Sequence, residues 1–174
     1  MIVALMGYMG SGKSTLGKAL ASLLNYKFLD LDAYISEQEN ATIPELFDNK
    51  GEIYFRKKET QYLKEVLDSN EDIVLALGGG TPCYGNNLKL LLDNDDVTSF
   101  YLKLSIPLLT ERLFKERDSR PLISHLQTED ELMEFIGKHL FERSPYYNQA
   151  QHIINTDNNK MPQDILEELL MALI

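Results

Sequence analysis

The chain has 174 residues, of which 44% are hydrophobic and 25% charged, and this composition favours one globular domain over a disordered or membrane-spanning chain. The formal net charge of −10 argues against a nucleic-acid partner, because proteins that bind nucleic acids present basic surfaces. Cys83 is the only cysteine, which excludes an intrachain disulfide and a thiolate zinc site, and we expect it to be a small buried side chain. We predict a single cytoplasmic domain over residues 1–174, monomeric and without a membrane span.

The first element is an apolar run at residues 2–6, which predicts a buried strand. GYMGSGKS follows at residues 7–14 and has the spacing G-x-x-x-x-G-K-[ST]. From Leu16 onward, leucines recur on one face of a predicted helix. A strand, a glycine-rich turn and a helix in this order are the setting of a phosphate-binding loop. A glycine-rich turn that binds nothing is a poor alternative, so we predict a nucleoside triphosphate site.

Each part of this loop has a chemical reason. The loop glycines allow backbone N–H groups to turn inward, and the helix N-terminus favours an anion. Lys13 supplies a positive charge for the outer phosphates, and Ser14 has a hydroxyl where Mg²⁺ is bound. The predicted ATP-binding residues of the loop are Gly10, Ser11, Gly12, Lys13, Ser14 and Thr15.

The next apolar stretch, residues 27–31, predicts a strand that carries the sequence FLDLD. Asp30 and Asp32 are two residues apart, so on a strand both side chains would project to the same side. One carboxylate could hold Mg²⁺ through water, and the other could orient or deprotonate an attacking hydroxyl. The alternative is that Asp32 caps the helix that follows.

The motif KGEIYFRKKET at residues 50–60 places Arg56 between two acidic residues at helical spacing, Glu52 and Glu59. These could be surface ion pairs worth a few tenths of a kcal/mol (~0.3). Phe55 beside Arg56 would, however, set a flat apolar wall next to a forked cation. That combination suits a ring that bears a carboxylate.

Two later motifs complete the candidate site. LALGGGTP ends a predicted strand in Gly78, Gly79 and Gly80, and we favour close ligand approach over tight packing as the reason for three glycines. Arg143 precedes Pro145, where we expect a helix to end. Arg143 could act on a ligand or only interact with that helix C-terminus.

The segment KERDSRPLISHLQTED, residues 115–130, has no sustained periodicity and joins two helical patterns. It contains Arg120 and predicts either a mobile lid, placed at about residues 112–128, or a plain solvated loop.

The remaining elements alternate between strands and helices. Capping boxes predict helix starts at Thr42 and Thr128, and Pro162 fits the start of the last helix. Alternating strands and helices predict an α/β fold, a three-layer α/β/α domain around a parallel five-stranded sheet. Ligands should bind where the strands end. The predicted strands are residues 2–6, 27–31, 73–77, 97–104 and 152–155.

The order of motifs in this chain resembles that of the shikimate kinase family over nearly the whole chain. The motifs are G-x-x-G-x-G-K-S-T, F-x-D-x-D, G-E-x-x-F-R-x-x-E, G-G-G, R-P-L and R-x-P-Y-Y. The resemblance implies a P-loop kinase fold with a mobile lid. It also implies Mg²⁺-dependent transfer of the ATP γ-phosphate to the 3-hydroxyl of shikimate, in aromatic amino acid biosynthesis.

The resemblance also implies roles for single residues. Lys13, Asp32 and Arg120 would be catalytic, Arg120 would reach ATP from the lid, and Ser14 with Asp30 would hold Mg²⁺. Glu59 would hold Arg56 in place, and residues 155–160 would approach adenine. The implied shikimate-binding residues are Asp32, Phe55, Arg56, Gly78, Gly79, Gly80 and Arg143.

Two other functions compete with this one. Another P-loop kinase, for gluconate or a nucleoside monophosphate, would share the phosphate loop but would not need Phe55, Arg56 and Arg143. A non-catalytic nucleotide sensor would not need Asp32.

Overall fold

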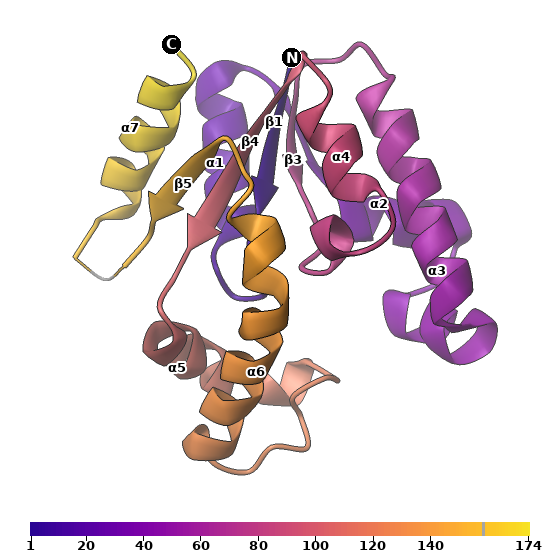
Figure 1. Ribbon diagram of the computed structural model, residues 1–174, viewed down its shortest axis with the longest axis vertical. Coiled ribbons are helices and arrows are strands. Elements are labelled where there is room, and N and C mark those ends of the chain that lie inside the picture. The colour runs from indigo at the N-terminus through magenta and orange to yellow at the C-terminus, as the bar shows by residue number, and fades with distance from the viewer. Residues whose placement is uncertain (158) are drawn as a thin grey trace.

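The computed structural model describes residues 1–157 and 159–174. Within them the strands form one parallel sheet in the order β2-β3-β1-β4-β5 (Figure 1). The predicted fold class is confirmed, and three predicted strands are each one residue too long at the carboxyl end. The strands are β1 (Ile2–Met6), β2 (Lys27–Asp30), β3 (Ile73–Ala76), β4 (Val97–Lys103) and β5 (His152–Asn155).

Helices connect successive strands, and the capping boxes mark two of their starts. Thr42 Oγ1 accepts a hydrogen bond from the Glu45 backbone N–H, and Thr128 is matched by Glu131 in the same way. No helix in these two described ranges is long and apolar enough to cross a membrane. The helices are α1 (Lys13–Leu24), α2 (Leu31–Glu39), α3 (Ile43–Leu67), α4 (Asn87–Leu92), α5 (Ile106–Glu116), α6 (Glu129–Tyr147) and α7 (Pro162–Ala172).

The central strand β1 is buried on both faces, as its continuous apolar sequence predicts. Val3 and Leu5 pack in a cluster with residues of α1 and α7, such as Leu20 and Leu169. Met6 belongs to a larger cluster on the opposite face. Each face of the sheet is therefore covered, which makes three layers.

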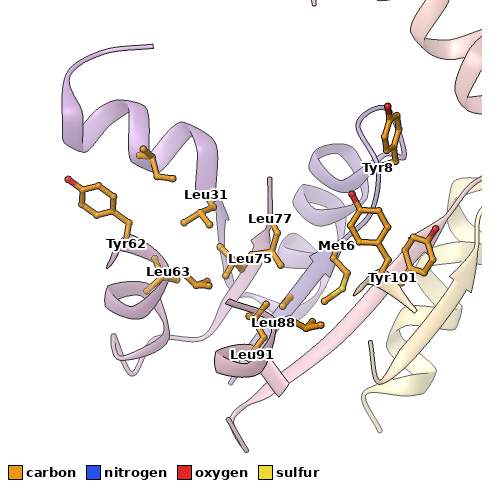
Figure 2. Packing of buried hydrophobic residues seen from close by; sticks show 14 of the residues in the cluster. Met6, Tyr8, Leu31, Tyr62, Leu63, Leu75, Leu77, Leu88, Leu91 and Tyr101 are labelled. Atoms are coloured by element: carbon orange, nitrogen blue, oxygen red, sulfur yellow. The ribbon is translucent and has the colours of Figure 1, made fainter. Parts of the chain in front are cut away.

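The larger cluster fixes the end of β3. Figure 2 shows Leu75 and Leu77 beside Leu31 of α2 and Leu63 of α3, with Leu88 of α4 close by. All of these are nearly fully buried. Because this packing holds Leu77, the triple glycine that follows starts from a rigid position.

One prediction about the acidic pair is wrong. Strand β2 ends at Asp30, whose Oδ1 accepts a hydrogen bond from the Ala33 backbone N–H at 3.1 Å and caps α2. Asp32 therefore lies in the first turn of α2 rather than on the strand. The cap that we considered for Asp32 is formed by Asp30.

Helix α6 also differs from expectation. It does not end before Pro145 but continues through it to Tyr147, which places Arg143 inside the helix. Helix α5 extends to Glu116, so the first five residues of the predicted lid, 112–116, are helical. The short 3-10 helix η2 (Arg117–Ser119) follows, and Ile123 is fully buried beyond it.

Candidate active site

The phosphate loop between β1 and α1 requires glycine at two positions. Gly10 and Gly12 have φ angles of 78° and 97°, in the left-handed region. A Cβ atom on Gly10 would also lie 2.9 Å from Leu113 Cδ2 of α5. Helix α1 then begins at Lys13 without a side-chain cap, which leaves its first N–H groups available to an anion.

Lys13 is held inside this loop. Its Nζ donates hydrogen bonds to the carbonyl oxygens of Gly7 at 2.8 Å and Tyr8 at 3.0 Å. Burial lowers the pKa of Lys13 to about 8, and the carboxylates of Asp32 and Asp30 oppose this change. The amine therefore remains mostly charged at neutral pH and lies where phosphate oxygens would replace the two carbonyls.

Ser14 and Asp30 lie together beside the loop, since Ser14 Oγ donates a hydrogen bond to Asp30 Oδ2 at 3.1 Å. Residues 1–157 and 159–174 contain no group of three or more His, Cys, Asp or Glu side chains that could hold a metal. A cation here would take its remaining ligands from phosphates and water. One hydroxyl and one carboxylate beside a phosphate site fit Mg²⁺, which keeps several waters and binds few protein ligands.

Asp32 faces the triple glycine. A Cβ atom on Gly78 would come within 2.7 Å of Asp32 Oδ1, so only glycine leaves room for the carboxylate. Burial raises the pKa of Asp32 to about 6, and the negative charges of Asp30 and Glu59 add to the increase. Asp32 is mostly ionised at pH 7 and is a stronger base than an ordinary aspartate, which suits it to accept a proton.

Arg56 of α3 is held by Glu59 and by an aromatic ring. Its Nη1 donates to Glu59 Oε1 at 2.8 Å, and the Glu59 side chain is only 1% exposed. The guanidinium carbon lies 3.8 Å from the ring centroid of Tyr84 and 5.2 Å from that of Phe55. The surface-pair alternative is thus wrong for Arg56 and Glu59, because this pair is mostly buried.

The triple glycine is where the two arginines meet. A Cβ atom would lie 3.0 Å from Arg143 Nη1 if it were on Gly79, and 2.9 Å from Arg56 Nη2 if it were on Gly80. The Tyr147 hydroxyl donates a hydrogen bond to the Gly79 carbonyl oxygen and joins α6 to this loop. Because Gly79 and Gly80 have no side chains, the guanidinium groups of Arg56 and Arg143 can lie against this loop.

These groups share one cleft of about 380 Å³ at the carboxyl ends of the strands. The phosphate loop and the triple glycine are far apart in the sequence, and residues of both line this cleft. Arg56 and Arg143 lie against the glycines next to it. The lining residues include Lys13, Ser14, Asp30, Asp32, Gly79 and Arg120.

Comparison with known proteins identifies the family. A family model described as shikimate kinase matches residues 9–174. The chain belongs to the shikimate kinase family. The shikimate kinase of Flavobacterium johnsoniae is 49% identical over 170 residues, which cover 96% of this chain and 98% of that protein. Membership of the shikimate kinase family confirms the prediction of an enzyme, a kinase that acts on shikimate.

Solved shikimate kinase structures have the same fold. The crystal structure from Bacteroides thetaiotaomicron matches with a TM-score of 0.89 at 37% identity and covers 99% of this chain and 98% of that one. The structure from Acinetobacter baumannii, in complex with shikimate, matches with a TM-score of 0.84 at 34% identity. The match covers 99% of this chain and 92% of that one. The parallel sheet and its connections are thus those of shikimate kinases.

The arginine predicted for the lid, Arg120, lines the cleft. Arg120 donates from Nε and Nη2 to Glu116 Oε2, at 3.0 and 2.7 Å. Arg112 of α5 donates to the Gly10 carbonyl oxygen at 3.2 Å, whereas the Arg117 guanidinium lies 4.1 Å from the Phe114 ring centroid. Among these arginines, Arg112 and Arg120 line the cleft.

Other predicted residues have more peripheral places. Phe55 is 3% exposed and packs on Phe47 with ring centroids 4.7 Å apart, so it lies behind Arg56. Cys83 is half-buried, and burial raises the pKa of its thiol to about 11, which keeps it neutral. In the segment expected near adenine, Asn158 lies outside the described residues, and that prediction stays untested.

Sequence reasoning missed Tyr84 and Tyr147. Tyr84 is four residues beyond the glycines, in a loop with no periodicity, and its contact with Arg56 arises only when α3 packs nearby. Tyr147 belongs to the quoted P-Y-Y motif, which was a usable signal. Only the folded chain shows that its hydroxyl reaches Gly79.

Proposed function

We propose that the cleft places the γ-phosphate of ATP beside the 3-hydroxyl of shikimate and that Asp32 accepts the hydroxyl proton. The position of Asp32 supports this role, since it lies between the phosphate loop and the paired arginines. Phosphoryl transfer depends mainly on alignment and on stabilising charge at the transferring group. Lys13 and Arg120 would supply the positive charge that stabilises the transferring phosphoryl group.

We propose that Arg56 and Arg143 bind the carboxylate of shikimate. Both are planar, permanently charged forks that converge on Gly79 and Gly80. A ring held by its carboxylate at this end would direct its hydroxyls toward Asp32. This local pair of cations explains how a chain with a net charge of −10 can bind an anion.

Ser14 and Asp30 would hold Mg²⁺ in this scheme. When bound, the ion would neutralise phosphate charge and fix the phosphate orientation. Asp30 can serve as helix cap and as metal ligand together, because one carboxylate oxygen caps α2 and the other faces Ser14.

Residues 112–128 would form the lid that brings Arg120 onto ATP. Arg112, Glu116 and Arg120 line the cleft, and the ion pair of Arg120 with Glu116 is partly exposed, which supports this. We also propose that residues 1–174 act as one monomeric domain in the cytoplasm, where ATP is available. One chain supplies every residue assigned above.

A coupled assay with MgATP tests the substrate assignment. Shikimate, quinate, gluconate and nucleoside monophosphates would each be offered as acceptors, and we expect turnover with shikimate only. Faster turnover with gluconate or a nucleoside monophosphate would overturn the assignment and favour another P-loop kinase activity. ATP binding without turnover of any acceptor would favour a nucleotide sensor.

A further inference from the structure

A buried hydrogen-bond network lies behind Arg56. Glu59 uses both carboxylate oxygens: Oε1 accepts from Arg56 Nη1 at 2.8 Å, and Oε2 accepts from Thr81 Oγ1 at 2.8 Å. Glu59 is 1% exposed and Thr81 is fully buried. The carboxylate that orients Arg56 is therefore itself held from the far side by one hydroxyl.

Thr81 is also held through its backbone. Asn87 Nδ2 donates to the Thr81 carbonyl oxygen at 3.0 Å, and Thr60 Oγ1 donates to Asn87 Oδ1 at 2.7 Å. Thr60 follows Glu59 on α3, so adjacent residues of one helix reach the hydroxyl and, through Asn87, the carbonyl of the same threonine. The Thr81 N–H donates to the Gly78 carbonyl oxygen at 3.0 Å and closes the turn that contains the triple glycine.

We propose that Thr81 is a positioning residue for shikimate recognition, acting through Glu59 on Arg56. Without its hydroxyl, one oxygen of a buried carboxylate would lose its partner, which is costly in a dry environment. The Glu59 carboxylate would rotate toward Arg56, or water would enter beside it. In either case the Arg56 guanidinium would move relative to Gly80 and Arg143. This inference rests on the proposed function, in which Arg56 binds the shikimate carboxylate.

The test compares Thr81→Val with Thr81→Ser. Valine keeps the shape of threonine and removes the hydroxyl, whereas serine keeps the hydroxyl and loses a methyl group. We expect the valine variant to raise the KM for shikimate about tenfold, the size of one lost hydrogen bond to a charged group. The KM for ATP should stay within twofold in both variants, and serine should restore shikimate KM toward the parent value.

Thermal melting of each variant shows whether it is folded. If Thr81→Val does not fold, Thr60→Val removes the next bond of the same network, with Thr60→Ser as its control, and the same selective rise in shikimate KM is expected.

Unchanged shikimate KM in a folded valine variant would overturn the inference, as would equal increases in both KM values or a failure of serine to rescue. A parent chain that does not turn over shikimate would overturn the proposed function, and the inference with it. An active parent with an unaffected valine variant overturns the inference alone.

Discussion

Two arginines, one beside the cleft and one lining it, are held in contrasting ways. Arg56 pairs with Glu59 at 2.8 Å, and the two side chains are 19% and 1% exposed. Arg120 pairs with Glu116 at 2.7 Å, but these side chains are 35% and 52% exposed. Similar distances therefore describe one buried pair and one that is open to solvent.

Burial decides what each pair can do. An exposed pair contributes about 0–1 kcal/mol, so incoming phosphate oxygens can displace Glu116 from Arg120. Separating a buried pair leaves an uncompensated charge and costs several kcal/mol (~3–5), so Arg56 keeps its partner. The arginine proposed to bind the shikimate carboxylate is thus held in a fixed geometry, and the arginine proposed to bind ATP is ready to exchange partners.

The largest effect is expected at Asp32, the proposed proton acceptor. Asp32→Asn keeps the shape of the side chain but removes the proton acceptor. Catalysis should fall by roughly 10²–10⁴-fold, the contribution of a positioned base, with ATP binding little changed. Steady-state kinetics and ATP titration measure the two quantities.

Asp30→Asn is the matched control for that prediction. Its defect should be relieved in part by raised Mg²⁺, because mass action restores an ion whose site has lost one contact. A rate titration against Mg²⁺ compares the variants. Rescue of Asp32→Asn by metal, without rescue of Asp30→Asn, would reverse the two roles.

The proposed binding of the shikimate carboxylate is tested next by Arg56→Lys and Arg143→Lys. Each change keeps the positive charge and loses the planar fork, so shikimate affinity should fall roughly tenfold to a hundredfold. The KM for ATP should not change. Isothermal titration with shikimate measures this, and parent-like affinity in both variants would mean that the two arginines are structural.

The exposed pair of Arg120 with Glu116 is tested by Glu116→Gln. Removal of the carboxylate frees Arg120 for phosphate, so the KM for ATP should fall by about two- to fivefold, the range of a surface pair. Lys138→Gln is a control, because it breaks a helix pair of the same i,i+4 spacing with Glu134, which is more exposed and does not line the cleft. An unchanged KM for ATP in Glu116→Gln would show that this pair does not compete with ATP.

The last prediction concerns pH and the helix that carries Arg143. His139 Nδ1 lies 2.9 Å from the Tyr8 hydroxyl of the phosphate loop, on the helix that also carries Arg143. Burial lowers the pKa of His139 from 6.5 to about 4, the Arg143 charge adds to this, and Glu142 opposes it. The unfolded chain therefore binds more protons between pH 6.5 and 4, and stability falls as the pH decreases through that range.

His139→Gln removes this titration. Its melting temperature should decline less than that of the parent between pH 6.5 and 4. Above pH 7 the melting temperatures of the two proteins should change with pH at the same rate. Thermal melts across this range measure it. Parallel declines in both proteins would show that His139 titrates alike in the folded and unfolded chain.

Local patterns were enough to predict much of this protein. The phosphate loop, the capping boxes at Thr42 and Thr128 and the five strands depend on neighbours within a few residues, and the sequence displays those directly. Family membership followed from motif order. Lys13, Asp32 and Gly79 line one cleft because parallel strands end at a common edge, whereas Arg56 and Arg143 lie beside it against the glycines.

Tertiary structure decided the rest. Whether Asp30 or Asp32 caps α2 depends on the residue at which β2 leaves the sheet. Helical spacing places Glu59 beside Arg56, but the burial of this pair and the contact of Arg56 with Tyr84 arise only because α3 packs near the glycine loop. The role proposed for Thr81 also depends on the fold, because its hydroxyl donates to Glu59, 22 residues earlier, and its carbonyl oxygen accepts from Asn87, 6 residues later. Sequence spacing determines which residues can act, and packing between distant elements determines which of them are held rigidly and which can exchange partners.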